Sequence, residues 1–128
     1  PRLWGTFPRV IGHYARDLGL FPIETAIHKM TRLPAKVFGL ADRGRIAMGA
    51  FADLVVFDPA QIIDRATYDA PRQPSLGIAR VYVNGRLAYT PEAGVSARAG
   101  RLVGGLYAAN TVGAIVGSLG GVRGCFEG

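Results

Sequence analysis

The chain has 128 residues, 49% of them hydrophobic, so it can form one domain with a real core and is not intrinsically disordered. Its net charge of +6 is spread along the chain without a basic stripe, which argues against nucleic-acid binding. The single cysteine, Cys125, excludes an internal disulfide and favours a cytoplasmic protein. No methionine or signal segment stands at Pro1, so we expect the chain to be part of a longer protein.

Residues 6–40 are predicted to form three short helices. Pro8 and Pro22 are expected in first helical turns, and Gly19 and Gly39 at helix ends. The second helix carries a single apolar face that must be buried. The members of this face are Ile23, Ala26, Ile27 and Met30.

Extended structure is expected after Leu40. Residues 41–50 predict tight turns around a short extended piece. "ADLVVFDP", ending at Pro59, is a continuous apolar run typical of a strand buried on both faces. In "IARVYVNGRLAY", Asn84 and Gly85 separate two β-rich runs, which predicts a hairpin with a type I′ turn. Residues 69–77 are predicted to be a solvated loop.

Residues 102–122 contain no charge over 21 positions, enough to span a bilayer. Gly113, Gly117 and Gly121 recur every fourth residue, as in closely packed membrane helices. The alternative is a glycine-rich, poorly ordered tail, and both interpretations stay open. Cys125 has no His or Cys neighbour in sequence and is not expected to be a ligand or a nucleophile.

Two segments resemble a known family. "PRLWGTFPRVIGHYARDLGLFPIETAIHKMTRLPAKVFGLADRGRIAMGAFADLVVFDP" and "GIARVYVNGRLAY" are similar to the carboxy-terminal part of the N-acyl-D-amino-acid deacylases (D-aminoacylases), within the metal-dependent amidohydrolase superfamily. The resemblance covers about residues 1–101. "KMTRLPAKVFGLADRGRIAMGAFADLVVFDP" is typical of the whole superfamily, whereas "PRLWGTFPRVIGHYARD" is narrower and is similar to the segment that closely follows the last metal-site aspartate in D-aminoacylases.

The resemblance implies an α+β fragment. Residues 1–40 would be the last helices of an amidohydrolase (β/α)8 barrel, and residues 41–101 the carboxy-terminal strands of a small β-sandwich. Residues 102–128 would be a glycine-rich apolar tail that is foreign to the enzyme, through a frameshift, a gene junction or a fusion. Removing them from a complete enzyme is expected to leave its activity intact.

The implied activity is zinc-dependent hydrolysis of N-acyl-D-amino acids, small-molecule substrates, to a carboxylate and a D-amino acid. The family's metal ligands and catalytic aspartate would all precede Pro1. His13 and His28 have no H-x-H spacing and are expected to be helix residues without a ligand role. The fragment alone is therefore predicted to be inactive and to bind no zinc, and its natural partner would be the remainder of its own chain.

Arg2 is the one candidate substrate-binding residue. It matches the family arginine that the resemblance implies binds the substrate carboxylate, for which a planar guanidinium is well suited. No catalytic or metal residue is expected in this chain. Asp53 and Asp58 flank the predicted strand at opposite ends and are interpreted as structural, because they are badly placed to act as a paired acid and base.

Two alternatives stay open. One is an enzyme of another amidohydrolase branch, resembling dihydroorotases or hydantoinases. The other is a non-enzymatic module anchored in a membrane by residues 102–122; apart from that tail, no membrane contact is expected. An H-x-H pair in upstream sequence would favour an enzyme, and a second hydrophobic span would favour the membrane module.

Overall fold

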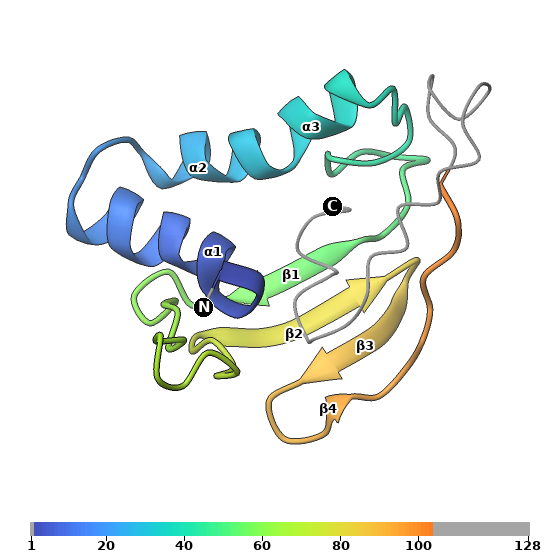
Figure 1. The fold of residues 1–128 in the computed structure, drawn as a ribbon. Helices are drawn as coiled ribbons and strands as arrows, with labels where there is room; N and C mark the ends of the chain where they lie inside the picture. The colour runs from blue at the N-terminus through green and yellow to red at the C-terminus, as the bar shows by residue number, and fades with distance from the viewer. Residues whose placement is uncertain (1, 104–128) are drawn as a thin grey trace.

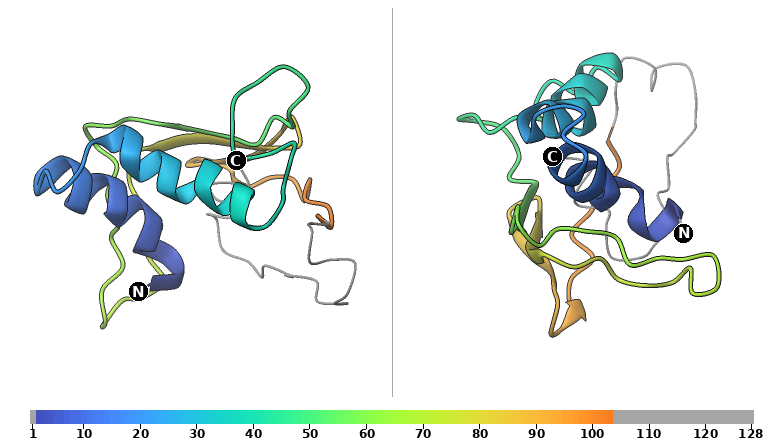
Figure 2. Two further views of the ribbon diagram at one scale, coloured as in Figure 1. Left: turned by 90° about the horizontal axis from the view of Figure 1, so that it is seen from above. Right: turned by 90° about the vertical axis from the view of Figure 1, so that its left-hand side faces the viewer.

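The computed structural model describes residues 2–103. One antiparallel sheet in the order β1-β2-β3-β4 lies beneath a layer of helices that covers one of its faces (Figure 1, Figure 2). This confirms the predicted α+β character. In chain order the elements are α1 (Arg2–Arg9), the π-helix η1 (Val10–Asp17), α2 (Ile23–Met30), α3 (Arg32–Val37), β1 (Leu54–Phe57), β2 (Ile78–Val83), β3 (Arg86–Thr90) and β4 (Gly94–Val95).

The prediction for the first helix is wrong at its start. The helix begins at Arg2, and Pro8 lies inside α1 instead of in a first turn. From Val10 the chain continues as a π-helix, a form that usually occurs as a single turn. Its wider hydrogen bonding is seen where the Leu18 N–H donates to the His13 carbonyl, five residues earlier, at 2.9 Å.

The predicted helix ends are confirmed, but Pro22 lies one residue before α2, with extended backbone, and not in its first turn. Gly19 and Gly39 have φ values of 60° and 71°, the left-handed conformation in which helices often end. Between residues 41 and 50 the expected turns occur, but no strand of the sheet forms there.

The core lies between the helices and the sheet. Ala26, at the centre of the predicted apolar face, is completely buried, and Ile23, Ile27 and Met30 pack against the same cluster. This confirms the prediction for the second helix. The buried members of the cluster are Ile11, Ala15, Ala26, Ile62, Ile78, Val81, Val83 and Ala88.

The hairpin prediction is confirmed. Val83 pairs with Arg86, which leaves Asn84 and Gly85 as a two-residue loop. Their φ values of 50° and 77° are both positive, as a type I′ turn requires. The short β4 was not predicted, because Gly94–Val95 is too brief to give a periodic pattern.

Within residues 2–103, β1 is not buried on both faces as predicted. Leu54 and Val56 of β1 are 37% and 48% exposed. They alternate with Val55, which faces the helices, and no element among residues 2–103 covers their face. β1 is also an edge strand, paired only with β2 in this part of the chain.

The predicted membrane segment lies almost entirely outside the described residues. Of residues 102–122, only Leu102 and Val103 fall in the described range, and Cys125 also lies outside it. Among the helices of residues 2–103, none has the length and apolarity needed to cross a bilayer.

Candidate functional site

Arg2, the predicted substrate-binding residue, is the first residue of α1, and its side chain is exposed. Thr6 Oγ1 donates a hydrogen bond to the Arg2 carbonyl at 2.7 Å and so closes the first turn. The start of the chain lies beside the loop that joins β1 to β2 (Figure 1, Figure 2). Arg2 is thus presented at the surface by a helix whose neighbour is this loop.

The β1–β2 loop contacts α1 at several points. Arg9 Nη1 donates to both carboxylate oxygens of Asp64, at 2.8 and 3.0 Å. Ser75 Oγ donates to the Trp4 carbonyl at 3.2 Å. Gly5 is buried against the loop, where an added Cβ would lie 2.6 Å from the Cβ of Asp64. These contacts hold α1, the helix that carries Arg2, against the β1–β2 loop.

Ion pairs on these helices shift the pKa values of Arg9 and Asp17. The hydrogen bond to Asp64 and the charge of that carboxylate raise the pKa of Arg9, so the guanidinium stays charged. In η1, the hydrogen bond from Arg16 lowers the pKa of the exposed Asp17 carboxyl. Arg16 also donates to the carbonyl of Ile62 at 2.9 Å, which ties the end of η1 to the start of the β1–β2 loop.

The two histidines are helix residues, as expected. His13 is half-buried in η1, with its ring 5.1 Å from that of Tyr14, and His28 is exposed on α2. Within residues 2–103, no three or more His, Cys, Asp or Glu side chains form a group that could hold a metal ion. The residues described therefore do not fit the zinc site that the sequence resemblance implies for a complete enzyme.

Asp53 and Asp58 both have structural partners. Asp58 accepts hydrogen bonds from the Ala60 N–H and from Gln61 Nε2, both at 2.8 Å, and so caps the turn after β1. Asp53 is buried, forms an ion pair with Arg43, and accepts the Asn84 N–H at 2.6 Å. Both carboxylates are thus engaged in contacts that hold turns and segments together, in agreement with their structural interpretation.

Arg43, Asp53 and Asn84 form a group that we call the buried latch. Arg43 Nη2 donates to Asn84 Oδ1 at 2.8 Å, and Asn84 Nδ2 donates to the Ala99 carbonyl at 2.7 Å. The latch joins the connection after α3, the start of β1, the hairpin turn and the segment after β4. It is a device for holding the fold together, not for chemistry.

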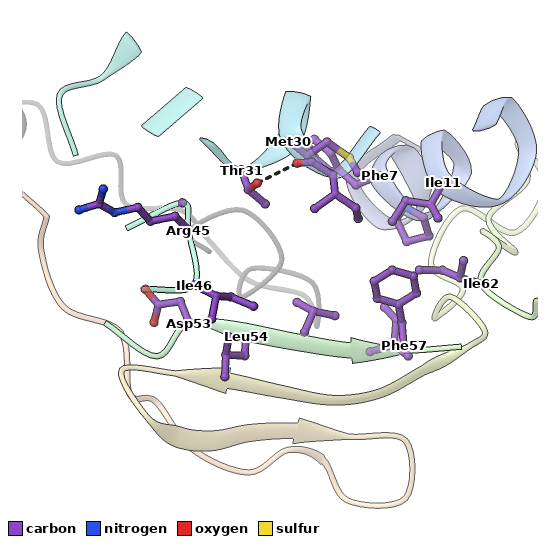
Figure 3. A pocket seen from close by; sticks show the side chains of 15 residues that line it. Phe7, Ile11, Met30, Thr31, Arg45, Ile46, Asp53, Leu54, Phe57 and Ile62 are labelled. Atoms are coloured by element: carbon purple, nitrogen blue, oxygen red, sulfur yellow. Dashed lines mark hydrogen bonds between the residues drawn. The ribbon is translucent and has the colours of Figure 1, made fainter. Parts of the chain in front are cut away.

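An apolar cavity of about 270 Å³ lies between the helices and β1. Figure 3 shows Phe7, Ile11 and Met30 on the helix side of it and Phe57 and Ile62 on the sheet side. Its polar side chains stand at one end, where Arg45 and Asp53 are found, and Asp53 is already engaged by the latch. The cavity thus offers mainly apolar surface, and among residues 2–103 no His, Cys, Asp or Glu lines it except the engaged Asp53.

Sequence patterns missed Arg43, Asp64 and Ser75, each of which acts on a partner at least ten residues away. For α1 and η1, the sequence does contain a signal of such contacts. Gly5 and Gly12 stand inside a helical segment, where glycine often marks a close approach of another backbone. A Cβ at Gly12 would lie 2.1 Å from the Ile62 carbonyl oxygen, so the approach is real.

Known proteins resemble this chain in both sequence and fold. The model of the amidohydrolase family matches residues 1–89. D-aminoacylase of Alcaligenes xylosoxydans xylosoxydans is 59% identical over 103 residues, which cover 80% of this chain and 21% of that protein. A crystal structure of D-aminoacylase superposes with a TM-score of 0.79 and 56% identity, over 81% of this chain and 22% of that one.

A second solved relative is N-acyl-D-glutamate deacylase from Bordetella bronchiseptica, complexed with zinc and a phosphonate inhibitor. It superposes with a TM-score of 0.70 and 52% identity, covering 74% of this chain and 20% of that one. The chain therefore spans about a fifth of the length of these relatives. Because the family model matches more than half of the chain and the fold agrees, the chain belongs to the amidohydrolase family.

Proposed function

We propose that this chain is the carboxy-terminal part of a zinc-dependent hydrolase that cleaves N-acyl-D-amino acids into a carboxylate and a D-amino acid. The observation that carries the proposal is 59% identity to a D-aminoacylase across 103 residues. Zinc is included because the similar N-acyl-D-glutamate deacylase was solved with zinc. Residues outside the described range would have to bind the ion.

In this proposal, α1, α2 and α3 are the last helices of the catalytic barrel, and the sheet is one part of a β-sandwich. The exposed outer face of the sheet supports this. Leu54, Tyr82 and Leu87 are cross-strand neighbours, and Leu54 and Leu87 are 37% and 40% exposed. A second sheet packed on this face would bury these apolar side chains.

Arg2 is proposed to bind the α-carboxylate of the substrate. Its guanidinium is exposed at the very start of α1, so a ligand can reach it. A planar fork of N–H donors matches both oxygens of a carboxylate. Such a contact would fix the orientation of the amino acid and so place its acyl amide for hydrolysis.

A chimera tests the proposal. Residues 2–103 would replace the matching segment of the Alcaligenes D-aminoacylase, and hydrolysis of an N-acetyl-D-amino acid would be measured. We expect an active enzyme, in which Arg2→Ala costs about 2–5 kcal/mol of transition-state stabilisation. Arg2→Lys should recover part of this, since one ammonium cannot reproduce the two-point contact. The corresponding amino acid amide, which lacks the carboxylate, should be hydrolysed equally well by all three.

Two outcomes would contradict the proposal at different points. A folded, zinc-loaded chimera without activity would show that this chain cannot serve a deacylase. An active chimera in which Arg2→Ala impairs both substrates equally would show that Arg2 supports the structure only. Sequence upstream of Pro1 provides an independent test, because a deacylase requires an H-x-H pair there.

A further inference from the structure

The first helix needs a hydrogen-bond donor from outside, because Pro8 lies within it. In an α-helix, the N–H of residue 8 would bond to the carbonyl of Trp4, and proline has no N–H. Ser75 Oγ donates to that carbonyl at 3.2 Å. The β1–β2 loop therefore contributes a bond to α1 that the sequence of the helix itself does not provide.

Asp64 makes a second attachment on the same helix. Because Gly5 has no Cβ, the helix backbone rests directly on the Asp64 side chain. Both oxygens of the Asp64 carboxylate also accept hydrogen bonds from the Arg9 guanidinium. The Asp64 side chain is only 6% exposed, against 46% for Arg9, so α1 encloses the carboxylate.

We infer that Asp64 and Ser75 are positioning residues, which clamp α1 against the β1–β2 loop and thereby aim Arg2 at the substrate carboxylate. This inference rests on the proposed role of Arg2. Asp64 and Ser75 hold Gly5, Arg9 and Trp4, all within two turns of Arg2. Neither residue would touch the substrate, so both act through the placement of the helix.

Asp64 and Ser75, which we call the clamp, can be lost without unfolding the rest of the chain. The next helical segment, η1, has attachments of its own, because Ile11 and Ala15 are in the core and Gly12 packs on the Ile62 carbonyl. Loss of Asp64 or Ser75 should therefore loosen α1 while η1 stays in place. The expected consequence is a misdirected Arg2 in a folded enzyme.

The experiment uses the complete, zinc-loaded chimera and compares an N-acetyl-D-amino acid with its amide. Asp64→Asn keeps the size of the side chain and removes its charge, and we expect kcat/KM for the acid to fall about tenfold, since small misplacements of a binding group are costly. Ser75→Ala should lower kcat/KM for the acid about fivefold, because it removes one hydrogen bond. Ser75→Thr, which keeps a hydroxyl donor, should restore most of this loss. For the amide, every variant should stay within about twofold of wild type.

The matched control is Asp69→Asn, the same chemical change at an exposed position of the same loop. It should leave both substrates unaffected. If the wild-type chimera does not hydrolyse the acid, the proposed function fails and this inference with it. If wild type is active and Arg2→Ala is selective for the acid, but Asp64→Asn and Ser75→Ala impair both substrates equally or neither, the clamp alone is refuted.

Discussion

Two carboxylates pair with arginines from different segments of the chain, and they do so in different surroundings. Asp53 and Arg43 are both withdrawn from water, with side chains 1% and 2% exposed. In the other pair Asp64 is enclosed, but Arg9 stays 46% exposed. A fully buried pair is costly to break, because the charge that remains has no water, whereas water readily replaces an exposed partner. The latch is thus suited to securing the fold, and the clamp to placing a helix.

Asp53→Ala should cause the largest loss of stability, and it tests directly whether the buried latch secures the fold more strongly than the clamp. It leaves the Arg43 guanidinium buried without its counter-charge, so we expect a loss of about 3–5 kcal/mol of stability. The Asn84 N–H, which donates to Asp53, reports the change directly. Its hydrogen exchange in the complete chimera should become much faster. Exchange at the wild-type rate would show that the latch does not secure the hairpin turn.

Gly12→Ala probes the separate backbone contact between η1 and the β1–β2 loop. The new Cβ would meet the Ile62 carbonyl oxygen at 2.1 Å, which neither backbone can accept without moving. We expect destabilisation of about 1–3 kcal/mol, seen as a lower thermal midpoint of the chimera. Gly100→Ala, where an added Cβ has no neighbour within 4 Å, is the control and should be neutral.

Asn84→Gly distinguishes the turn from the latch. Glycine adopts the positive φ of the type I′ turn at least as easily as asparagine, so the turn alone would be unaffected. The variant loses the side-chain bonds to Arg43 and Ala99, and we expect a cost of about 1–2 kcal/mol in the thermal stability of the chimera. Unchanged stability would mean that Asn84 is present for its backbone conformation only.

Arg9→Ala should have the smallest effect on stability. Because Arg9 is nearly half exposed, its loss is expected to cost less than about 1 kcal/mol, and the difference from wild type should shrink as salt screens the pair. Thermal melts of the chimera at low and high sodium chloride measure this. A cost as large as that of Asp53→Ala would remove the distinction between clamp and latch.

What the sequence predicted well depends on neighbouring residues. The Asn84–Gly85 turn, the helix ends at Gly19 and Gly39, and the apolar face around Ala26 each follow from backbone preference or spacing within a few positions.

What the sequence did not predict depends on distant partners. Pro8 is tolerated inside α1 where Ser75, 67 residues later, supplies a donor to Trp4. In the same way, Asp53 was recognised as structural, but its partner Arg43 could not be identified from spacing, because burial decides which charges meet. The exposure of β1 likewise depends on which element covers the sheet, not on the composition of the strand.

The π-helix η1 has a consequence for how the length of this protein can vary. A helix with five-residue hydrogen bonding accommodates an extra residue without forming a loop, so a deletion between Val10 and Asp17 would be absorbed by a return to α-helical winding. The lost residue would come out of the wider turn, so α1, which precedes η1, would keep its orientation relative to the core. Arg2 would then stay on the same side of the molecule. We therefore expect homologous deacylases that use this arginine to tolerate the loss of a residue in this segment.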